Sequence, residues 1–169
     1  MLNKKLETAL NEQINAEFWS AYFYLSMSAD FAAKGMTGFA NWMHIQFREE
    51  QDHALKIMNY MLSRNSRPEL KPIAKVPTQW ESPLKAFEDT LKHEQEVTAM
   101  INKLYAIASE QKDYATLSML KWFVDEQVEE EATAQSLIDA LRMIKDNGFG
   151  IYTLDRELRA RTYSPIADE

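Results

Sequence analysis

The stretch from Asn65 to Pro83, NSRPELKPIAKVPTQWESP, separates two long helix-forming segments and limits how they can be arranged. Its four prolines predict an extended connection rather than a helix. A helix of about 27 residues is ~40 Å long, and ~18 extended residues reach ~60 Å. The connection can therefore run the full length of a helix bundle, which would leave the helices before and after it parallel.

Outside this connection, the other breaks in the chain are short. Residues 34–38 and 111–113 are short enough to fold neighbouring helices back antiparallel, and residues 146–150 end the fourth segment. The chain holds only 4 Gly and 5 Pro, and good helix formers are abundant. We expect an all-α four-helix bundle with one long crossover between the second and third helices and a short fifth helix. The expected helices are residues 5–34, 39–64, 84–110, 114–144 and 150–161.

Length, composition and net charge limit the kinds of protein that this chain can be. With 169 residues and 46% hydrophobic residues, the chain can bury one core, so we expect one domain over residues 1–161 and a C-terminal tail over 162–169. The net charge of −7 and the scattered Lys and Arg argue against nucleic acid as a partner. The absence of Cys excludes disulfides and thiolate metal sites. No apolar run is long enough to span a membrane, so a cytoplasmic location is expected.

Each long helix interrupts its apolar seam with one glutamate. At the 3–4 spacing of a bundle seam these are Glu17, Glu50, Glu94 and Glu130, with His53 one turn after Glu50 on the same side. The expected seams are Leu6, Leu10, Gln13, Glu17, Ser20, Tyr24, Met27 and Phe31 in the first helix; Phe39, Met43, Phe47, Glu50, Ala54, Ile57 and Met61 in the second; Phe87, Leu91, Glu94, Thr98, Ile101 and Tyr105 in the third; and Leu120, Phe123, Gln127, Glu130, Ala134, Leu137, Leu141 and Ile144 in the fourth.

These glutamates should lie at one height in the bundle. Glu94 precedes the turn residue Lys112 by 18 residues and Glu130 follows it by 18. Glu17 and Glu50 differ in their distance from the first turn by a few residues, which long side chains can span at ~1.5 Å per residue. Four carboxylates in one apolar layer cannot all ionise unpaired, because burial and like charges both raise their pKa values.

Two divalent metal ions would balance the four negative charges, with the imidazole of His53 neutral. Carboxylate oxygen with imidazole nitrogen suits iron or manganese, although zinc would also bind such a set. A polar layer can alternatively fix the register of the helices without any metal. The ligand set therefore predicts a metal centre, but it does not by itself establish redox chemistry.

The run Arg48-Glu49-Glu50-Gln51-Asp52-His53 carries a Glu-x-x-His motif, and Gln127-x-x-Glu130 lies in the fourth helix. Together with Glu17 and Glu94, these motifs resemble the ferritin family, specifically the non-haem bacterial ferritins, over nearly the whole chain. Residues 11–13 and 118–122 add to the likeness. The resemblance implies a ferritin-like fold.

The resemblance also implies a role for each residue. Glu17, Glu50 and His53 would hold one iron, and Glu50, Glu94 and Glu130 a second, with Glu50 bridging. Gln127 would lie near the second iron, and Tyr24 would donate a hydrogen bond close to the centre. Glu49, Glu126 and Glu129, sharing Glu130, match the family's third iron site.

The implied activity is ferroxidase, the oxidation of Fe(II) by O2 or H2O2, with storage of Fe(III) as mineral in a homo-oligomeric shell of 24 subunits. Haem is not expected, because Asp52 precedes His53 where haem-binding relatives have a ligating Met, and the second motif is Gln127-x-x-Glu130. Two alternatives stay open: a di-iron oxidase or peroxidase that stores no iron, and a non-catalytic helical scaffold.

Overall fold

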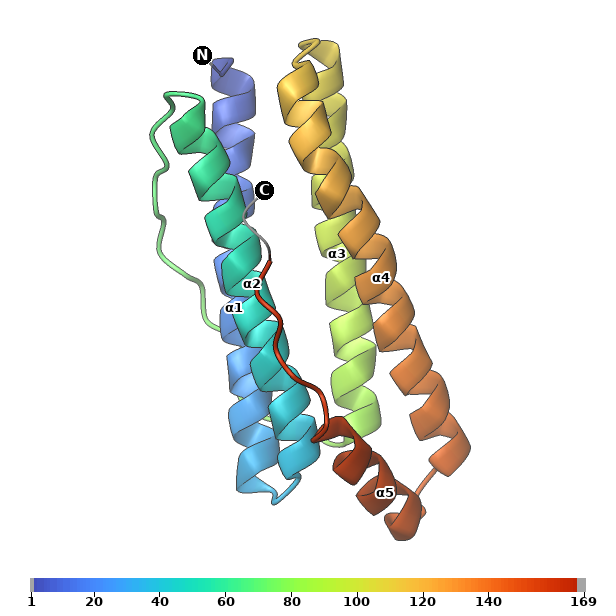
Figure 1. The fold of residues 1–169 in the computed structure, drawn as a ribbon. Helices are drawn as coiled ribbons and strands as arrows, with labels where there is room; N and C mark the ends of the chain where they lie inside the picture. Colours follow the sequence, from blue (N-terminus) through green and yellow to red (C-terminus); the bar gives the residue numbers. More distant parts are fainter. Residues whose placement is uncertain (1, 167–169) are drawn as a thin grey trace.

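The computed structural model describes residues 2–166 and shows five helices, with no β-strand among those residues (Figure 1). The all-α bundle with a short fifth helix is therefore confirmed, and the helix ends differ from the expected ones by a few residues. The helices are α1 (Lys4–Ala33), α2 (Thr37–Ser63), α3 (Pro83–Glu110), α4 (Tyr114–Ile144) and α5 (Gly148–Leu158). None of the helices described is long and apolar enough to cross a membrane.

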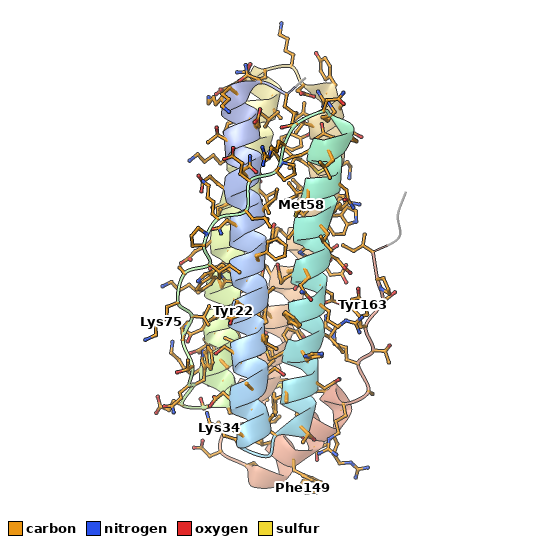
Figure 2. All side chains as sticks on the ribbon, turned by 90° about the vertical axis from the view of Figure 1, so that its left-hand side faces the viewer. Tyr22, Lys34, Met58, Lys75, Phe149 and Tyr163 are labelled. Carbon is orange, nitrogen blue, oxygen red and sulfur yellow. The ribbon has the colours of Figure 1, made fainter. Side chains whose placement is uncertain are left out.

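The helices form two antiparallel pairs, α1 with α2 and α3 with α4 (Figure 1). The extended chain after α2 runs along the outside of the first pair to the other end of the bundle, so α2 and α3 point the same way, as predicted (Figures 1 and 2). Helix α5 lies across that end of the bundle.

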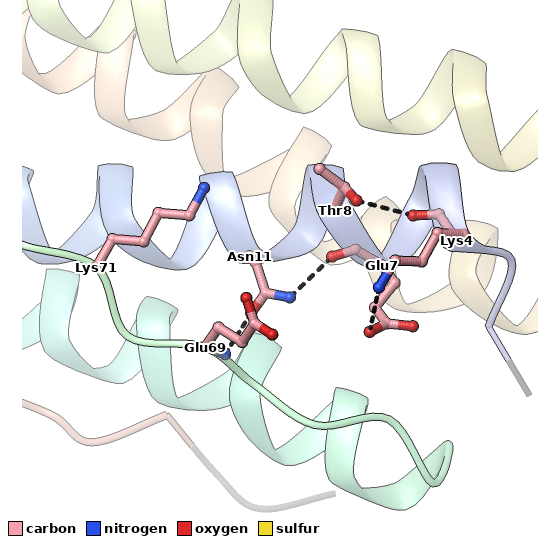
Figure 3. A pocket seen from close by; sticks show the side chains of 6 residues that line it. All are labelled: Lys4, Glu7, Thr8, Asn11, Glu69 and Lys71. Atoms are coloured by element: carbon pink, nitrogen blue, oxygen red, sulfur yellow. Dashed lines mark hydrogen bonds and ion pairs between the residues drawn. The ribbon is translucent and has the colours of Figure 1, made fainter.

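Polar side chains of α1 hold this crossover along its length. Asn11 donates to the Glu7 carbonyl at 3.1 Å, and its Oδ1 accepts from the Glu69 amide at 2.7 Å (Figure 3). At the far end, Asp30 Oδ2 accepts from the amide of Trp80, whose side chain is buried. The crossover is therefore a packed part of the fold.

Side-chain caps set where three of the long helices begin. Asn3 accepts from the Lys5 amide, Ser82 from the Lys85 amide and Asp113 from the Thr116 amide, at 2.9–3.1 Å. Each bond satisfies an amide that has no partner within its own helix.

The polar layer divides the apolar interior into two clusters. The cluster nearer α5 includes Phe31, Phe39 and Phe87, and the cluster at the opposite end includes Leu10, Ile57 and Phe123. The predicted seam of α1 is buried at every position. The helices therefore pack through apolar side chains on both sides of the polar layer, and this packing holds the polar side chains in place.

Six predicted seam positions outside α1 are not buried: Tyr105 is exposed, and Phe47, Leu91, Thr98, Leu137 and Ile144 are only half-buried. Tyr105 is 38% exposed and Leu104 is buried in its place, and in α4 Ile138 is buried while Leu137 is only half-buried. An α-helix drifts relative to a strict 3.5-residue repeat, so the buried stripe moves to a neighbouring residue at several positions, including Gln46 beside Phe47 and Val97 beside Thr98.

Helix α5 is docked by a buried carboxylate. Asp155 Oδ1 accepts from the amides of Gly38 and Phe39 at 2.8 and 3.1 Å, so it caps the start of α2. A Cβ at position 38 would lie 1.6 Å from the Asp155 carbonyl oxygen, so only glycine allows this approach.

After α5 the chain turns back along α2 (Figure 1). The expected tail begins at Thr162; residues 162–166 are described, and 167–169 lie outside the described residues. Within the described part, the Tyr163 hydroxyl donates to Asp52 Oδ2 at 2.6 Å, which places this segment against α2 (Figure 2).

Candidate metal centre

Helices α1 and α2 bring three of the predicted ligands together. Glu17, Glu50 and His53 each offer one ligand atom, and these atoms lie within 4.8 Å of one another. His53 Nδ1 lies 3.4 Å from Glu50 Oε2. All three side chains are buried, which is the arrangement expected of a Glu-x-x-His turn facing a glutamate on the neighbouring helix.

Helices α3 and α4 supply the other half of the layer. Tyr24 donates to Glu94 Oε1, and Gln127 Nε2 donates to Glu94 Oε2 at 3.1 Å. Glu130 Oε2 accepts from Gln46 Nε2 at 2.9 Å. Glu94 and Glu130 are buried at the level of the first three residues but lie outside their close group, so the layer consists of two facing halves.

Burial and mutual repulsion shift the carboxyl groups toward their neutral forms. Burial, then the charge of Glu50, raises the pKa of Glu17 well above its ordinary value. Burial, then the charges of Glu94 and Glu130, raises the pKa of Glu50. Burial, then the charge of Glu94, raises the pKa of Glu130 to about 8. Without a cation, the layer therefore retains protons near neutral pH.

The unpaired oxygens of the layer fit a cation. Gln13 Nε2 donates to Glu17 Oε1 at 2.8 Å, but the buried Glu17 Oε2 has no hydrogen-bond partner. Gln46 Oε1 is buried without a partner as well. Buried acceptor oxygens normally have partners, and carboxylate oxygens with an imidazole nitrogen are ligands that divalent iron, manganese and zinc accept.

The residues expected at a third site are less closely gathered. Glu126 Oε1 lies 3.9 Å from His53 Nε2, and Glu49 is half-buried one turn before His53. Burial raises the pKa values of Glu49 and Glu126. Glu129 is exposed, and its charge also raises the pKa of Glu126. In the part of the chain that is described, these three carboxylates do not form a close ligand group.

Three neighbours of the centre were missed in the sequence. Gln46 lies one turn before Glu50 on the same face of α2, so the spacing could have revealed it. His93 accepts or donates a 2.7 Å hydrogen bond with Ser20 and packs against Trp19, and burial lowers its pKa. Arg161 reaches Glu49 from beyond α5, a contact that no helical spacing predicts.

Comparison with known proteins shows which family and which relatives this chain resembles. Residues 7–144 match the family described as Ferritin-like domain. "Bacterial non-heme ferritin" of Bacteroides fragilis is 44% identical over 161 residues, covering 95% of this chain and 100% of that protein. The protein of the same name from Staphylococcus aureus is 41% identical over 163 residues, covering 96% and 98%.

Solved structures agree with these sequence matches. An engineered closed form of the Archaeoglobus fulgidus ferritin has a TM-score of 0.95 and is 43% identical, covering 97% of this chain and 100% of that chain. The open-pore ferritin of the same organism also has a TM-score of 0.95 at 43% identity, covering 96% and 100%.

A one-crossover four-helix bundle with a buried layer of carboxylates and one histidine defines a class of carboxylate-bridged metal proteins. The matches narrow the class, and the chain belongs to the ferritin family, among the non-haem bacterial ferritins. The resemblance seen in the sequence is thereby confirmed.

Proposed function

We propose that this chain is an iron-storage ferritin with ferroxidase activity, which takes Fe(II) as its substrate at the buried layer. The observation that carries the proposal is the group of Glu17, Glu50 and His53, in which three buried ligand atoms lie within 4.8 Å of one another. The unpartnered Glu17 Oε2 supports it, because a buried carboxylate oxygen without a donor gains most from a cation.

Two ferrous ions would bind in the layer, each held by its own set of residues. Glu17 and His53 would bind one ion, Glu94 and Glu130 the other, and Glu50 would contact both. Two Fe(II) would give one electron each to O2, and two protons would complete H2O2. Because some carboxyl groups of the layer hold protons when no metal is bound, binding of Fe(II) would release protons from the layer.

The hydrogen-bond donors around the layer would position the ligands. Gln46 on Glu130 and Gln13 on Glu17 each leave the second carboxylate oxygen without a side-chain donor. Both oxygens of Glu94 accept a hydrogen bond, one from Tyr24 and one from Gln127, and each keeps a further lone pair for an ion. Gln127 presents its Nε2 to Glu94, so it would act here as a donor to a ligand. Glu49, Glu126 and Glu129 would receive a third iron beside the pair, and a shell of 24 subunits would store the oxidised product.

Anaerobic titration with Fe(II), followed by exposure to O2, tests this proposal. Two Fe(II) per chain should bind and then oxidise rapidly, with an absorbance rise that needs both ions. If no fast oxidation occurs, the layer is a structural scaffold. If oxidation is fast but hundreds of irons per assembly do not stay soluble, the protein is a di-iron oxidase without a storage role.

A further inference from the structure

The chain after α5 places an arginine on the candidate third site. Asn41 Nδ2 donates to the carbonyls of Leu158 and Arg161 at 3.2 and 3.1 Å, which holds the segment against α2. The guanidinium of Arg161 lies over the Trp42 ring, 4.6 Å from its centre. From there Arg161 Nη2 reaches Glu49 Oε2 at 2.7 Å.

A second attachment holds the same segment farther along α2. The Tyr163 hydroxyl donates to Asp52 Oδ2 at 2.6 Å, and the Arg48 guanidinium carbon lies 3.6 Å from the centre of the Tyr163 ring (Figure 2). The attachments at Arg161 and Tyr163 contact α2 at Glu49 and at Asp52, one turn apart. Either one can therefore open while the other keeps the segment nearby.

The ion pair matters because Glu49 is one of the few carboxylates available to a third metal. Both side chains are mostly covered, with 25% of Arg161 and 21% of Glu49 exposed, so water screens the pair only in part. A divalent ion at Glu49 and a guanidinium on the same carboxylate would repel each other at close range. The two cations therefore compete for one ligand.

We propose that residues 159–166 form a latch in which Arg161 occupies Glu49 until a divalent metal ion displaces it. The inference rests on the proposed third iron position. The latch weakens metal binding at Glu49 but not at the buried pair, so metal enters the two positions in the layer before it reaches the third. Displacement of Arg161 frees the segment from Glu49, while Tyr163 keeps it tethered to Asp52.

Calorimetric titration with Zn²⁺, which undergoes no oxidation, tests the competition in the assembled protein. Arg161→Gln removes the positive charge and should tighten the third zinc by roughly two- to fivefold, since partly exposed ion pairs contribute modestly. The affinities of the first two zincs should not change. Arg159→Gln is the matched control, because Arg159 pairs with Asp155 at 3.2 Å in the same segment and does not contact Glu49.

Hydrogen exchange of residues 159–166, followed by mass spectrometry, gives a second readout. The informative amides are those of Arg159, Ala160 and Arg161, which donate to the carbonyls of Asp155, Glu157 and Leu158. In the parental protein, their exchange should be slower up to two zincs per chain than at three. Arg161→Gln should exchange faster even without metal. Glu49→Gln should also exchange faster without metal and should show no further change when zinc is added.

Each other outcome has a definite meaning. The latch is overturned if the third zinc binds the parental protein and Arg161→Gln with equal affinity. It is also overturned if hydrogen exchange in the segment does not change when the third zinc binds. If every variant binds two zincs and no third, Arg161 has no competitor and the latch is overturned, while the proposed oxidation site stands. If the parental protein binds no zinc in the layer, the proposed function itself fails.

Discussion

Gln46 on α2 donates a 2.9 Å hydrogen bond to Glu130 on α4, so the two halves of the candidate metal centre are joined by a residue that is not itself an expected ligand. The bond stabilises the ionised form of Glu130, yet burial and the charge of Glu94 dominate and raise its pKa to about 8. The metal-free protein therefore folds with Glu130 largely protonated at neutral pH.

This shift predicts how stability depends on pH. Between the ordinary value of 4.5 and about 8, the folded protein holds a proton that the unfolded chain has lost. The metal-free protein should therefore lose stability as pH rises through this range, by at most about 1.4 kcal/mol per pH unit for one site, and level off above it. Chemical unfolding at pH 5.5 to 8.5 measures the slope.

Glu130→Gln keeps the size of the side chain and an acceptor for Gln46, so it should make that slope shallower. Glu17 and Glu50 have raised pKa values as well and should leave part of the slope in place. An identical slope in the parental protein and in Glu130→Gln would show that Glu130 does not carry the extra proton.

The docking of α5 predicts a strong effect of one methyl group. Gly38→Ala places its Cβ against the Asp155 backbone and should force α5 off the start of α2, which costs about 2–4 kcal/mol through overpacking and weakened hydrogen bonds to a charged acceptor. Gly148→Ala is the control, since nothing lies within 4 Å of its added Cβ. Equal melting temperatures for the two variants would contradict this account.

Exposed apolar side chains predict assembly. Phe149 on α5 is 80% exposed at one end of the bundle (Figure 2). Met143 and Tyr114 are also largely exposed. Large exposed apolar side chains can become buried at contacts between subunits, as the proposed shell would require. Sedimentation velocity should show a large closed particle, and Phe149→Asp should shift the population toward smaller species with unchanged helical content. A parental protein that sediments as a monomer or dimer would exclude the shell.

The sequence predicted the topology because prolines and segment lengths leave few ways to connect long helices. It predicted the layer because one glutamate interrupts each apolar seam, and a buried charge is rare without a partner. The sequence did not predict the contacts between segments that are far apart in the chain. Arg161 on Glu49 and Asp155 on Gly38 depend on where α5 and the following chain pack, which the periodicity of a single helix does not encode.

Glu129 offers a test of which carboxylates serve the first turnover. It is exposed on α4, and the closely gathered ligand group does not include it. Glu129→Ala should leave the fast oxidation of the first two Fe(II) per chain close to the parental rate, because Glu129 lies outside the close ligand group. Only later oxidation should slow. Stopped-flow absorbance at two and at four Fe(II) per chain separates the phases, and loss of the first phase would mean that Glu129 belongs to the pair.

Glu50→Ala should have the opposite effect to Glu129→Ala, because we propose that Glu50 contacts both ferrous ions. Its Oε2 lies 3.4 Å from His53, and its pKa is raised by the charges of Glu94 and Glu130 across the layer. Glu50→Ala should therefore remove a ligand from both ferrous ions and abolish fast oxidation at two Fe(II) per chain.

The stability of the metal-free Glu50 variants distinguishes a metal centre from a structural ion pair. If Glu50 mainly repels its neighbours, Glu50→Ala and the isosteric Glu50→Gln should cost less than about 1 kcal/mol or stabilise the protein, because a buried repulsion is removed. If Glu50 instead holds a protonated His53 in a structural pair, its loss leaves a buried charge unpaired and costs about 3–5 kcal/mol. Unfolding midpoints of both variants, measured beside their stopped-flow oxidation, decide between the two. A stable variant that oxidises Fe(II) at the parental rate would show that Glu50 does not bridge the substrate ions.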